Sequence, residues 1–203
     1  KLDRLKIIEP VPALKKGRKY LVGYVGVMGK QEGIDYLLRS LQYIVNQKHR
    51  TDVHFGLVGG GTELASLQAY AHELGIEAHV TFTGRVSDQQ MLQMLNTADV
   101  CVNPDVANEM NDKSTMNKIM EYMALAKPMV QFDLSEGRFS AQEASLYARK
   151  NDTKDLAEKI LLLLDDPVKR KSMGDFGRNR ILTELEWEYE VPKLLETYRL
   201  LFL

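Results

Sequence analysis

Short apolar runs alternate along this chain with longer segments whose apolar residues recur every three or four positions. The strand-like runs cover residues 20–29, 53–61, 79–84, 98–102, 128–133 and 145–149. Helical stripes separate them, for example at residues 34–45 and 64–74. Strands that alternate with helices of this length imply right-handed crossover connections. The sequence therefore predicts an α/β fold with one parallel sheet and helices on both of its faces.

The same pattern predicts one domain, residues 20–186, with an extension at each end. Residues 1–19 contain prolines that discourage a helix and then a basic cluster, and they are expected to form a lead-in or interdomain linker. The basic cluster is either a solvated turn or a point of attraction to an anionic membrane surface. Residues 187–203 are expected to form a C-terminal helix. The chain starts KLDRLK, without an initiator Met or a signal-peptide pattern, so it is expected to be part of a longer protein.

Composition argues against several classes of function. A formal net charge of −1 over 203 residues gives no electrostatic case for a nucleic-acid partner. The longest apolar run, residues 160–164, is far too short to span a bilayer. A single cysteine excludes a disulfide framework within the chain, and the four histidines lack metal-ligand spacing. We therefore expect a cytoplasmic protein without a metal site.

Residues 111–128, NDKSTMNKIMEYMALAKP, predict a helix between two strands. Ser114 or Thr115 is expected to be its N-cap, which would leave backbone N–H groups free at the end of a parallel strand for an anion. Glu121 is expected on the polar side of the helix with Asn117 and Lys118, where a carboxylate can accept hydrogen bonds from a vicinal diol such as a ribose. A capped amphipathic helix with merely solvated polar residues is the alternative, and the pattern does not decide between them.

Glycine-rich turns follow the first two strands. Residues 23–33 fit neither the G-x-G-x-x-G pattern nor the P-loop pattern, but Gly29 and Lys30 could approach a phosphate. Gly60, in the second turn, and Arg85, after the third strand, should lie on the same edge of the sheet as the helix at 111–128. Each turn taken alone is equally well explained as a tight strand-to-helix connection.

In combination, several segments resemble one known family. They are VGYVGVMGKQEGIDYLLRSL, FGLVGGGTEL, VTFTGRV, ADVCVNPD and, as the most specific match, STMNKIMEYMALAKPMV. Their order resembles the C-terminal, donor-binding domain of retaining glycosyltransferases of the GT-B architecture, family 4, also described as glycosyl transferases group 1. The resemblance covers roughly residues 20–187 and implies a Rossmann-like domain.

The resemblance implies that the domain binds a nucleotide-diphospho-sugar, with no cofactor and no metal. Glu121 would hold the ribose, the amides at Thr115 to Asn117 the diphosphate, the backbone near Arg85 the base, and residues Asp112 to Ser114 the sugar. The acceptor, which would be a glycan, a lipid-linked sugar or a small molecule, and the catalytic residues would belong to an N-terminal domain outside this chain. The C-terminal helix would pack back towards that domain. The fragment alone would bind the donor weakly and transfer no sugar, and the whole protein would work in the cytoplasm, at the inner face of a membrane where the basic cluster engages lipid.

Three positions depart from the family pattern. Val27 and Glu32 stand where the family usually has an arginine and a lysine on the diphosphate, and Lys113 stands eight residues before Glu121, where a glutamate is usual. Asp112 could take the acidic role, and Lys30 or Lys118 the cationic one. Ala126 replaces a usual glycine. Two other interpretations stay open: a degenerate nucleotide-binding or scaffolding module, and another sugar-nucleotide-dependent α/β enzyme such as an epimerase.

Overall fold

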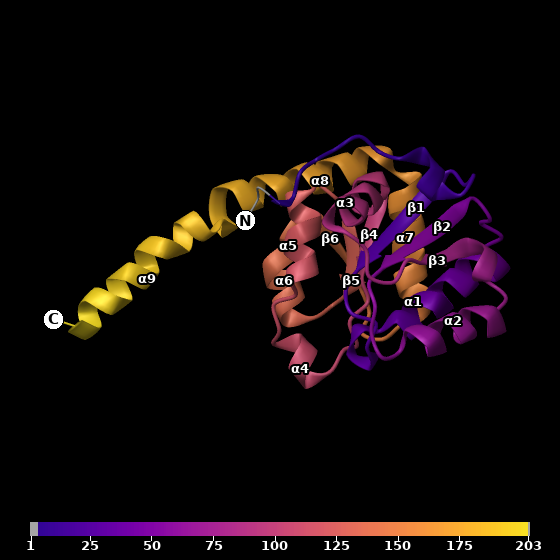
Figure 1. Ribbon diagram of the computed structural model, residues 1–203, viewed down its shortest axis with the longest axis horizontal. Helices are drawn as coiled ribbons and strands as arrows, with labels where there is room; N and C mark the ends of the chain where they lie inside the picture. The colour runs from indigo at the N-terminus through magenta and orange to yellow at the C-terminus, as the bar shows by residue number, and fades with distance from the viewer. Residues whose placement is uncertain (1–3, 203) are drawn as a thin grey trace.

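The computed structural model describes residues 4–202 and contains one six-stranded parallel sheet (Figure 1). Its strand order is β3-β2-β1-β4-β5-β6. The strands are β1 Tyr20–Val25, β2 Val53–Val58, β3 Val80–Phe82, β4 Val100–Asn103, β5 Met129–Phe132 and β6 Ser145–Ala148. The register of β1 with β2 runs from Tyr20 opposite Val53 to Val25 opposite Val58. The predicted α/β, Rossmann-like fold is therefore confirmed, and all six predicted strands are present.

The α-helices follow the strands as the periodicity predicted. They are α1 Ile34–Gln42, α2 Leu64–Glu73, α3 Asp88–Thr97, α4 Glu109–Asp112, α5 Asn117–Ala124, α6 Ser135–Ala141, α7 Thr153–Asp165, α8 Pro167–Arg180 and α9 Trp187–Phe202. Turns of π-helix extend α1 and α8, at Tyr43–Gln47 and Ile181–Leu185. The four-residue helix α4 was not predicted, because its apolar residues are too few to show a period.

Two apolar cores lie on opposite faces of the sheet. One is built by α1, α2 and α7 against side chains such as Val22, Tyr24 and Phe55, and the other by α3 and α5 against Leu21, Cys101 and Met129. Alternate residues of β1 enter different cores because successive side chains of a strand point to opposite faces. The connections from β1 to β3 run one way across the sheet, and those from β3 to β6 run the other way. Right-handed crossovers therefore place α1 and α2 on one face and α3 and α5 on the other (Figure 1).

The ends of the described chain differ in how they meet this body. The lead-in packs on α3, where Ile8 N donates to Asn96 Oδ1 (3.2 Å) and Val11 N donates to Thr97 Oγ1 (2.8 Å). Helix α9 instead projects away from the sheet and its helices (Figure 1). Several of its large apolar side chains are exposed, among them Trp187 and Leu195. Among residues 4–202, no helix combines the length and the apolar character needed to cross a bilayer.

Helix α5 ends in a left-handed residue at Ala126. Its φ of +54° lies in a region that glycine adopts without steric penalty and that costs other residues roughly 1–2 kcal/mol. This explains why the resembled family usually has a glycine at the position. The Ala126 carbonyl also packs on α8 so closely that a Cβ added at Gly174 would come within 2.2 Å of its oxygen.

Candidate functional site

The direction in which successive strands are added to the sheet reverses between β1 and β4. Strand β1 connects outward to β2 on one side, while β4 connects outward to β5 on the other, and the two strands are neighbours. In open α/β sheets, ligands bind in the crevice that this arrangement leaves at the carboxyl ends of the strands. The loops at this crevice are residues 26–33, 59–63, 83–87 and 104–116, and they contain most of the predicted site residues.

The first two loops are joined to each other through their backbones. Gly26 N donates to Val58 O (3.1 Å), Met28 N to Gly60 O (3.1 Å), and Glu63 N to Met28 O (2.9 Å). Gly59 has a φ of +133°, and a Cβ there would come within 1.8 Å of Gly26 O. Close approach between the two loops is therefore enough to explain Gly59, without a ligand.

Gly60 and Arg85 were predicted on the same edge, and the structure brings them together. A Cβ at Gly60 would lie 3.3 Å from Arg85 Cγ, and Gly59 N donates to Gly84 O next to it (3.0 Å). The Arg85 side chain is exposed and makes no hydrogen bond or ion pair within residues 4–202. An unpaired guanidinium beside Gly60 can stack on the plane of a ligand or donate hydrogen bonds to it.

The N-cap prediction for α5 was wrong. The N-cap is Met116, with no side-chain cap, and neither Ser114 nor Thr115 fills this role. Ser114 Oγ instead donates to Met110 O (2.6 Å), and Thr115 Oγ1 donates to Glu136 Oε1 (2.8 Å). Neither hydroxyl oxygen accepts a hydrogen bond from an N–H group of the first turn, so the helix end has no side-chain cap.

The consequence is an open helix terminus. Within the described chain, the backbone N–H groups of residues 115–118 donate to no protein acceptor, whereas Ile119 N reaches Met116 O (3.0 Å). Asn117 is exposed beside them. Several convergent N–H groups at the positive end of a helix dipole form a binding place for an anion.

Lys118 was predicted on the polar side of α5 with Asn117 and Glu121, and the structure shows that this lysine is buried among charged groups. Only 8% of the residue is exposed, and its Nζ lies 2.6 Å from Glu32 Oε2 and 2.7 Å from Asp105 Oδ1. Tyr24 OH donates to the same Glu32 oxygen (3.1 Å). Glu32 follows β1 and Asp105 follows β4, and these two strands are neighbours in the sheet. The two carboxylates therefore meet around this ammonium. We call Tyr24, Glu32, Asp105 and Lys118 the charge cluster.

Burial is the main influence on the pKa values of two members of this cluster, Asp105 and Tyr24. Burial raises the pKa of Asp105 to about 6, although the Lys118 ammonium opposes the shift and Glu32 adds to it. Burial also raises the pKa of the Tyr24 hydroxyl, so this group stays neutral. Asp105 was not predicted as a site residue, although its position directly after Asn103-Pro104 at the end of β4 could have indicated it.

Glu121 lies on α5, one turn after Lys118. Its side chain is half-buried and makes no hydrogen bond or ion pair with any residue from 4 to 202. Burial raises the pKa of this carboxyl, and its electrostatic neighbours are Arg4 and Asp88 on one side and Lys118 on the other. A desolvated carboxylate without a protein partner is an available acceptor of hydrogen bonds.

Asp112 is engaged within the protein. Its carboxylate accepts hydrogen bonds from Ser135 N (3.1 Å), Ser135 Oγ (2.8 Å) and Lys150 Nζ (3.0 Å). The Ser135 backbone amide, then Lys150, lower the pKa of Asp112 to about 2. The neighbouring Lys113 is exposed and pairs with Glu109 (2.8 Å). Asp112 therefore joins α4 to the start of α6, and its oxygens are occupied.

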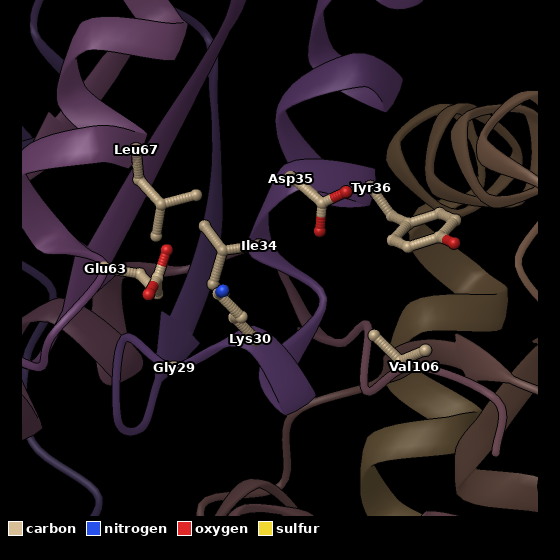
Figure 2. A pocket seen from close by; sticks show the side chains of 8 residues that line it. All are labelled: Gly29, Lys30, Ile34, Asp35, Tyr36, Glu63, Leu67 and Val106. Carbon is tan, nitrogen blue, oxygen red and sulfur yellow. The ribbon is translucent and has the colours of Figure 1, made fainter.

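Gly29 and Lys30 belong to a different hollow. They line a cavity of about 290 Å³ beside the first turns of α1 and α2, which Figure 2 shows. The side chains around it are Ile34, Asp35, Tyr36, Glu63, Leu67 and Val106. The structure thus brings Gly60, Arg85, Thr115, Asn117, Lys118 and Glu121 to the crevice, but it does not bring Gly29 and Lys30 to the same cavity surface.

Comparisons with known proteins identify the family of the chain. The family model described as Glycosyl transferases group 1 matches residues 19–166. The chain belongs to this family. The predicted resemblance to group 1 glycosyl transferases is therefore confirmed.

One curated relative in the group 1 family is a GDP-mannose-dependent monoacylated alpha-(1-6)-phosphatidylinositol monomannoside mannosyltransferase from Corynebacterium glutamicum. It is 26% identical over 164 residues, which are 79% of this chain and 42% of that protein. The chain thus spans less than half the length of this relative. Its sequence likeness to a named glycosyltransferase lies in one part of that longer protein.

Solved structures show the same fold. Anabaena Alr3699/HepE, in complex with UDP, superposes with a TM-score of 0.82 at 18% identity, covering 98% of this chain and 55% of that one. The C-terminal domain of a glycosyl transferase group 1 family protein, LpcC from Francisella tularensis, gives a TM-score of 0.75 at 16% identity and covers 92% of this chain and 98% of that one. The chain therefore has the fold of a C-terminal domain of this family.

Proposed function

We propose that this chain is the nucleotide-diphospho-sugar-binding half of a retaining glycosyltransferase. The observation that carries the proposal is the open amino end of α5, with the unpartnered, half-buried Glu121 on the same helix, at the crevice between β1 and β4. A negatively charged group suits the free amides and a vicinal diol suits the carboxylate. A nucleoside diphosphate carries both groups a few ångströms apart.

The residues of the crevice divide between the parts of such a donor. The base would lie against Gly60 and Arg85, the ribose hydroxyls would donate to Glu121, and the diphosphate would accept from the amides at Thr115 to Asn117. The sugar would extend toward residues 112–114, where backbone and Ser114 rather than the occupied Asp112 carboxylate would meet it. Gly29 and Lys30 line a separate cavity, and we assign them no contact with the diphosphate.

The chemistry would rest on charge that develops on the leaving group. As the bond between sugar and diphosphate breaks, negative charge grows on the diphosphate, and fixed N–H dipoles at a helix end stabilise it without reorganising. We propose that this supplies the stabilisation without a metal ion or cofactor. Retention of configuration at the anomeric carbon then requires either a front-face or a double-displacement route.

The acceptor would bind outside this chain. We propose that an N-terminal domain supplies the acceptor site and the catalytic residues, and that the exposed apolar side chains of α9 pack against it. The curated mannosyltransferase relative acts, by its name, on a phosphatidylinositol monomannoside, which supports a glycan or lipid-linked acceptor and work at the inner face of a membrane. The chain alone would then bind donor weakly and transfer no sugar.

Nucleotide binding and its dependence on Glu121 test the proposal. Thermal shift with UDP, GDP, ADP and NAD should show stabilisation by one of the nucleoside diphosphates and none by NAD, since a ligand that binds only the native state raises the melting temperature. The 2′-deoxy form of that nucleotide should bind roughly tenfold more weakly than the ribose form, as expected for one lost hydrogen bond to a charged group. In a Glu121→Ala variant, the two forms should bind equally.

Glu73→Ala, an exposed carboxylate on α2, is the matched control and should keep the preference for ribose. If no nucleoside diphosphate stabilises the protein at millimolar concentration, the donor site is absent, and the degenerate scaffolding module becomes the better interpretation. A preference for ribose that survives in Glu121→Ala would contradict the role assigned to Glu121.

A further inference from the structure

The charge cluster lies at the open N-terminal end of α5. It contains two carboxylates and one ammonium. Glu32 comes from the turn after β1, Asp105 follows β4, and Lys118 lies in the first turn of α5. Its ammonium is in contact with both carboxylates, at 2.6 and 2.7 Å. With both carboxylates ionised, the cluster has a net charge of −1, next to the helix end where the proposed function puts a diphosphate.

Within residues 4–202, no other cation is in contact with these two carboxylates. The groups that face the ammonium or its carboxylates are the Tyr24 hydroxyl from β1, which is neutral, and Glu121 from the next turn of α5. One oxygen of Asp105, Oδ2, is buried and has no hydrogen-bond partner within residues 4–202. Because an ionised carboxylate is costly to bury without full pairing, this oxygen is a favourable place for a proton.

A bound diphosphate would add negative charge next to the charge cluster. Like charges in a buried site disfavour each other, so at least one carboxylate becomes easier to protonate when the dianion arrives. The Lys118 ammonium is also the only cation of the cluster, and attraction to the diphosphate weakens its hold on the carboxylates. Burial raises the pKa of Asp105 to about 6 in the free protein, which puts the change within a physiological range.

We propose that Glu32 and Asp105 are positioning residues that hold the Lys118 ammonium for the diphosphate, and that donor binding takes up one proton from solvent onto this carboxylate pair. The proton brings the charge of the cluster from −1 to zero while the diphosphate is bound. The inference rests on the proposed function, because without nucleotide binding there is no linkage to measure. It adds that the affinity for the donor decreases as pH rises.

Calorimetric titration measures this proton directly. GDP-mannose and UDP-glucose are suitable probes because their diphosphates are diesters and do not titrate near neutral pH. Titrations at pH 7 in phosphate and in Tris, which differ in ionisation enthalpy, should show uptake of about half to one proton by the complex. The Kd of the tighter probe should rise roughly three- to tenfold between pH 6 and pH 8.

Glu32→Gln separates positioning from a merely structural role. The amide keeps the size of the side chain but removes one negative charge, so the cluster becomes neutral. In this variant the proton uptake should disappear, the Kd should become independent of pH, and binding at pH 8 should be tighter than in the wild type. Loss of a structural contact would instead weaken binding equally at every pH. Glu73→Gln on α2, whose carboxylate is exposed, should behave as the wild type does.

The outcomes distinguish this inference from the proposed function. If the wild type binds neither nucleotide sugar, the proposed function fails and the linkage fails with it. If it binds one of them with no proton uptake and the same Kd at pH 6 and pH 8, the linkage alone is wrong. Uptake that persists in Glu32→Gln would assign the proton to another group, such as Glu121, and would overturn the role given to the pair.

Discussion

The two ends of α5 are built in opposite ways. At the C-terminal end, every carbonyl from residue 121 to 124 has a donor: Leu125 N, Lys127 N, Ala126 N and, for Ala124 O, the Arg178 guanidinium. At the N-terminal end, the amides of residues 115–118 have no protein acceptor in the described chain, and the N-cap Met116 offers none. One end is completed by the protein and fixes the helix in place, so the other can stay free for a ligand.

Each end also holds a lysine: Lys118 is buried and Lys127 is half-buried, and their partners differ. Lys118 lies between two carboxylates, whereas Lys127 Nζ donates to the carbonyls of Asn96 (2.6 Å) and Ala98 (3.0 Å). Burial lowers the pKa of Lys127. The charges at the N-terminal end can therefore respond to a ligand or to pH in the neutral range, while the C-terminal end is a fixed structural contact. Five measurements test this contrast.

Removing the ammonium at the N-terminal end should have the largest effect. Lys118→Met leaves Glu32 and the buried Asp105 without a counterion, and the loss of one partner of a buried ion pair typically costs about 3–5 kcal/mol. Urea unfolding would measure the decrease in the free energy of unfolding. The triple variant Lys118→Met, Glu32→Gln, Asp105→Asn removes the orphaned charges and should recover most of the loss. A single variant as stable as the wild type would contradict the cluster.

Removing the ammonium at the C-terminal end should cost less. Lys127→Met leaves two carbonyls without their charged donor, a loss of about 1.5–3 kcal/mol in the free energy of unfolding. No carboxylate is left unpaired by this change. Nucleotide affinity, measured at a temperature where the variant is folded, should stay within about twofold of the wild type. A large loss of affinity would show that the two ends of α5 are not independent.

The pH dependence of stability should report the N-terminal end of α5 through Asp105. Because the pKa of Asp105 is raised to about 6, native Asp105 keeps a proton that the unfolded chain has already released. Its contribution is therefore fully present below about pH 4 and is lost as pH rises through 6, with a slope of at most about 1.4 kcal/mol per pH unit. Urea unfolding of the wild type and of Asp105→Asn at several pH values would measure this slope as the difference between the two proteins. His54, whose pKa is lowered to about 4 by burial, contributes with the opposite sign in the same pH range, but it is common to both proteins.

Asp112 provides the internal contrast for that experiment. Its pKa is lowered to about 2, so its contribution is present above its ordinary value near 4 and is lost as pH falls towards 2. The two carboxylates thus act in opposite directions and in separate pH ranges. A carboxyl titration by NMR should show one midpoint near 6 and one near 2. If both midpoints lay near 4, neither environment would be as described.

The smallest effect belongs to the residue that ends α5. Ala126→Gly relieves a left-handed backbone conformation at the cost of greater flexibility in the unfolded chain, and it should raise the free energy of unfolding by roughly 0.5–1 kcal/mol. Thermal unfolding would detect the gain. Nucleotide affinity should not change, because the substitution lies at the closed end of the helix. A destabilised variant would indicate that the methyl group has a packing role.

The sheet and its helices were predictable because they depend on local pattern. Each strand is a short apolar run, and each long helix has a stripe of period 3.6, so order and type follow from the sequence. The crossover rule then fixes the faces. The cap of α5 could not be predicted, because Ser114 and Thr115 are favourable N-cap residues by type, whereas in the structure the N-cap position falls on Met116.

The site was predictable only in part. Gly60 with Arg85, and the α5 terminus with Glu121, follow from the rule that strand ends share one edge. The burial of Lys118 could not be predicted, because its partners Glu32 and Asp105 come from two other loops. These loops meet only because β1 and β4 are neighbours in the sheet. For the same reason, Glu32 was interpreted from the sequence as the replacement of a family cation, whereas in the structure it is the counterion of Lys118.

Glutamine 31 connects two of the loops at this edge. Its backbone oxygen accepts from Val106 N and Asn111 Nδ2 (both 3.0 Å), and its side-chain oxygen accepts from Asn108 Nδ2 (2.9 Å). With the backbone joints between residues 26–28 and 58–63, three loops become one interlocked unit. One loop transplanted from a relative would lack the partners of these inter-loop hydrogen bonds. Divergence at this edge should therefore proceed by concerted replacement, and chimaeras should exchange all three segments together.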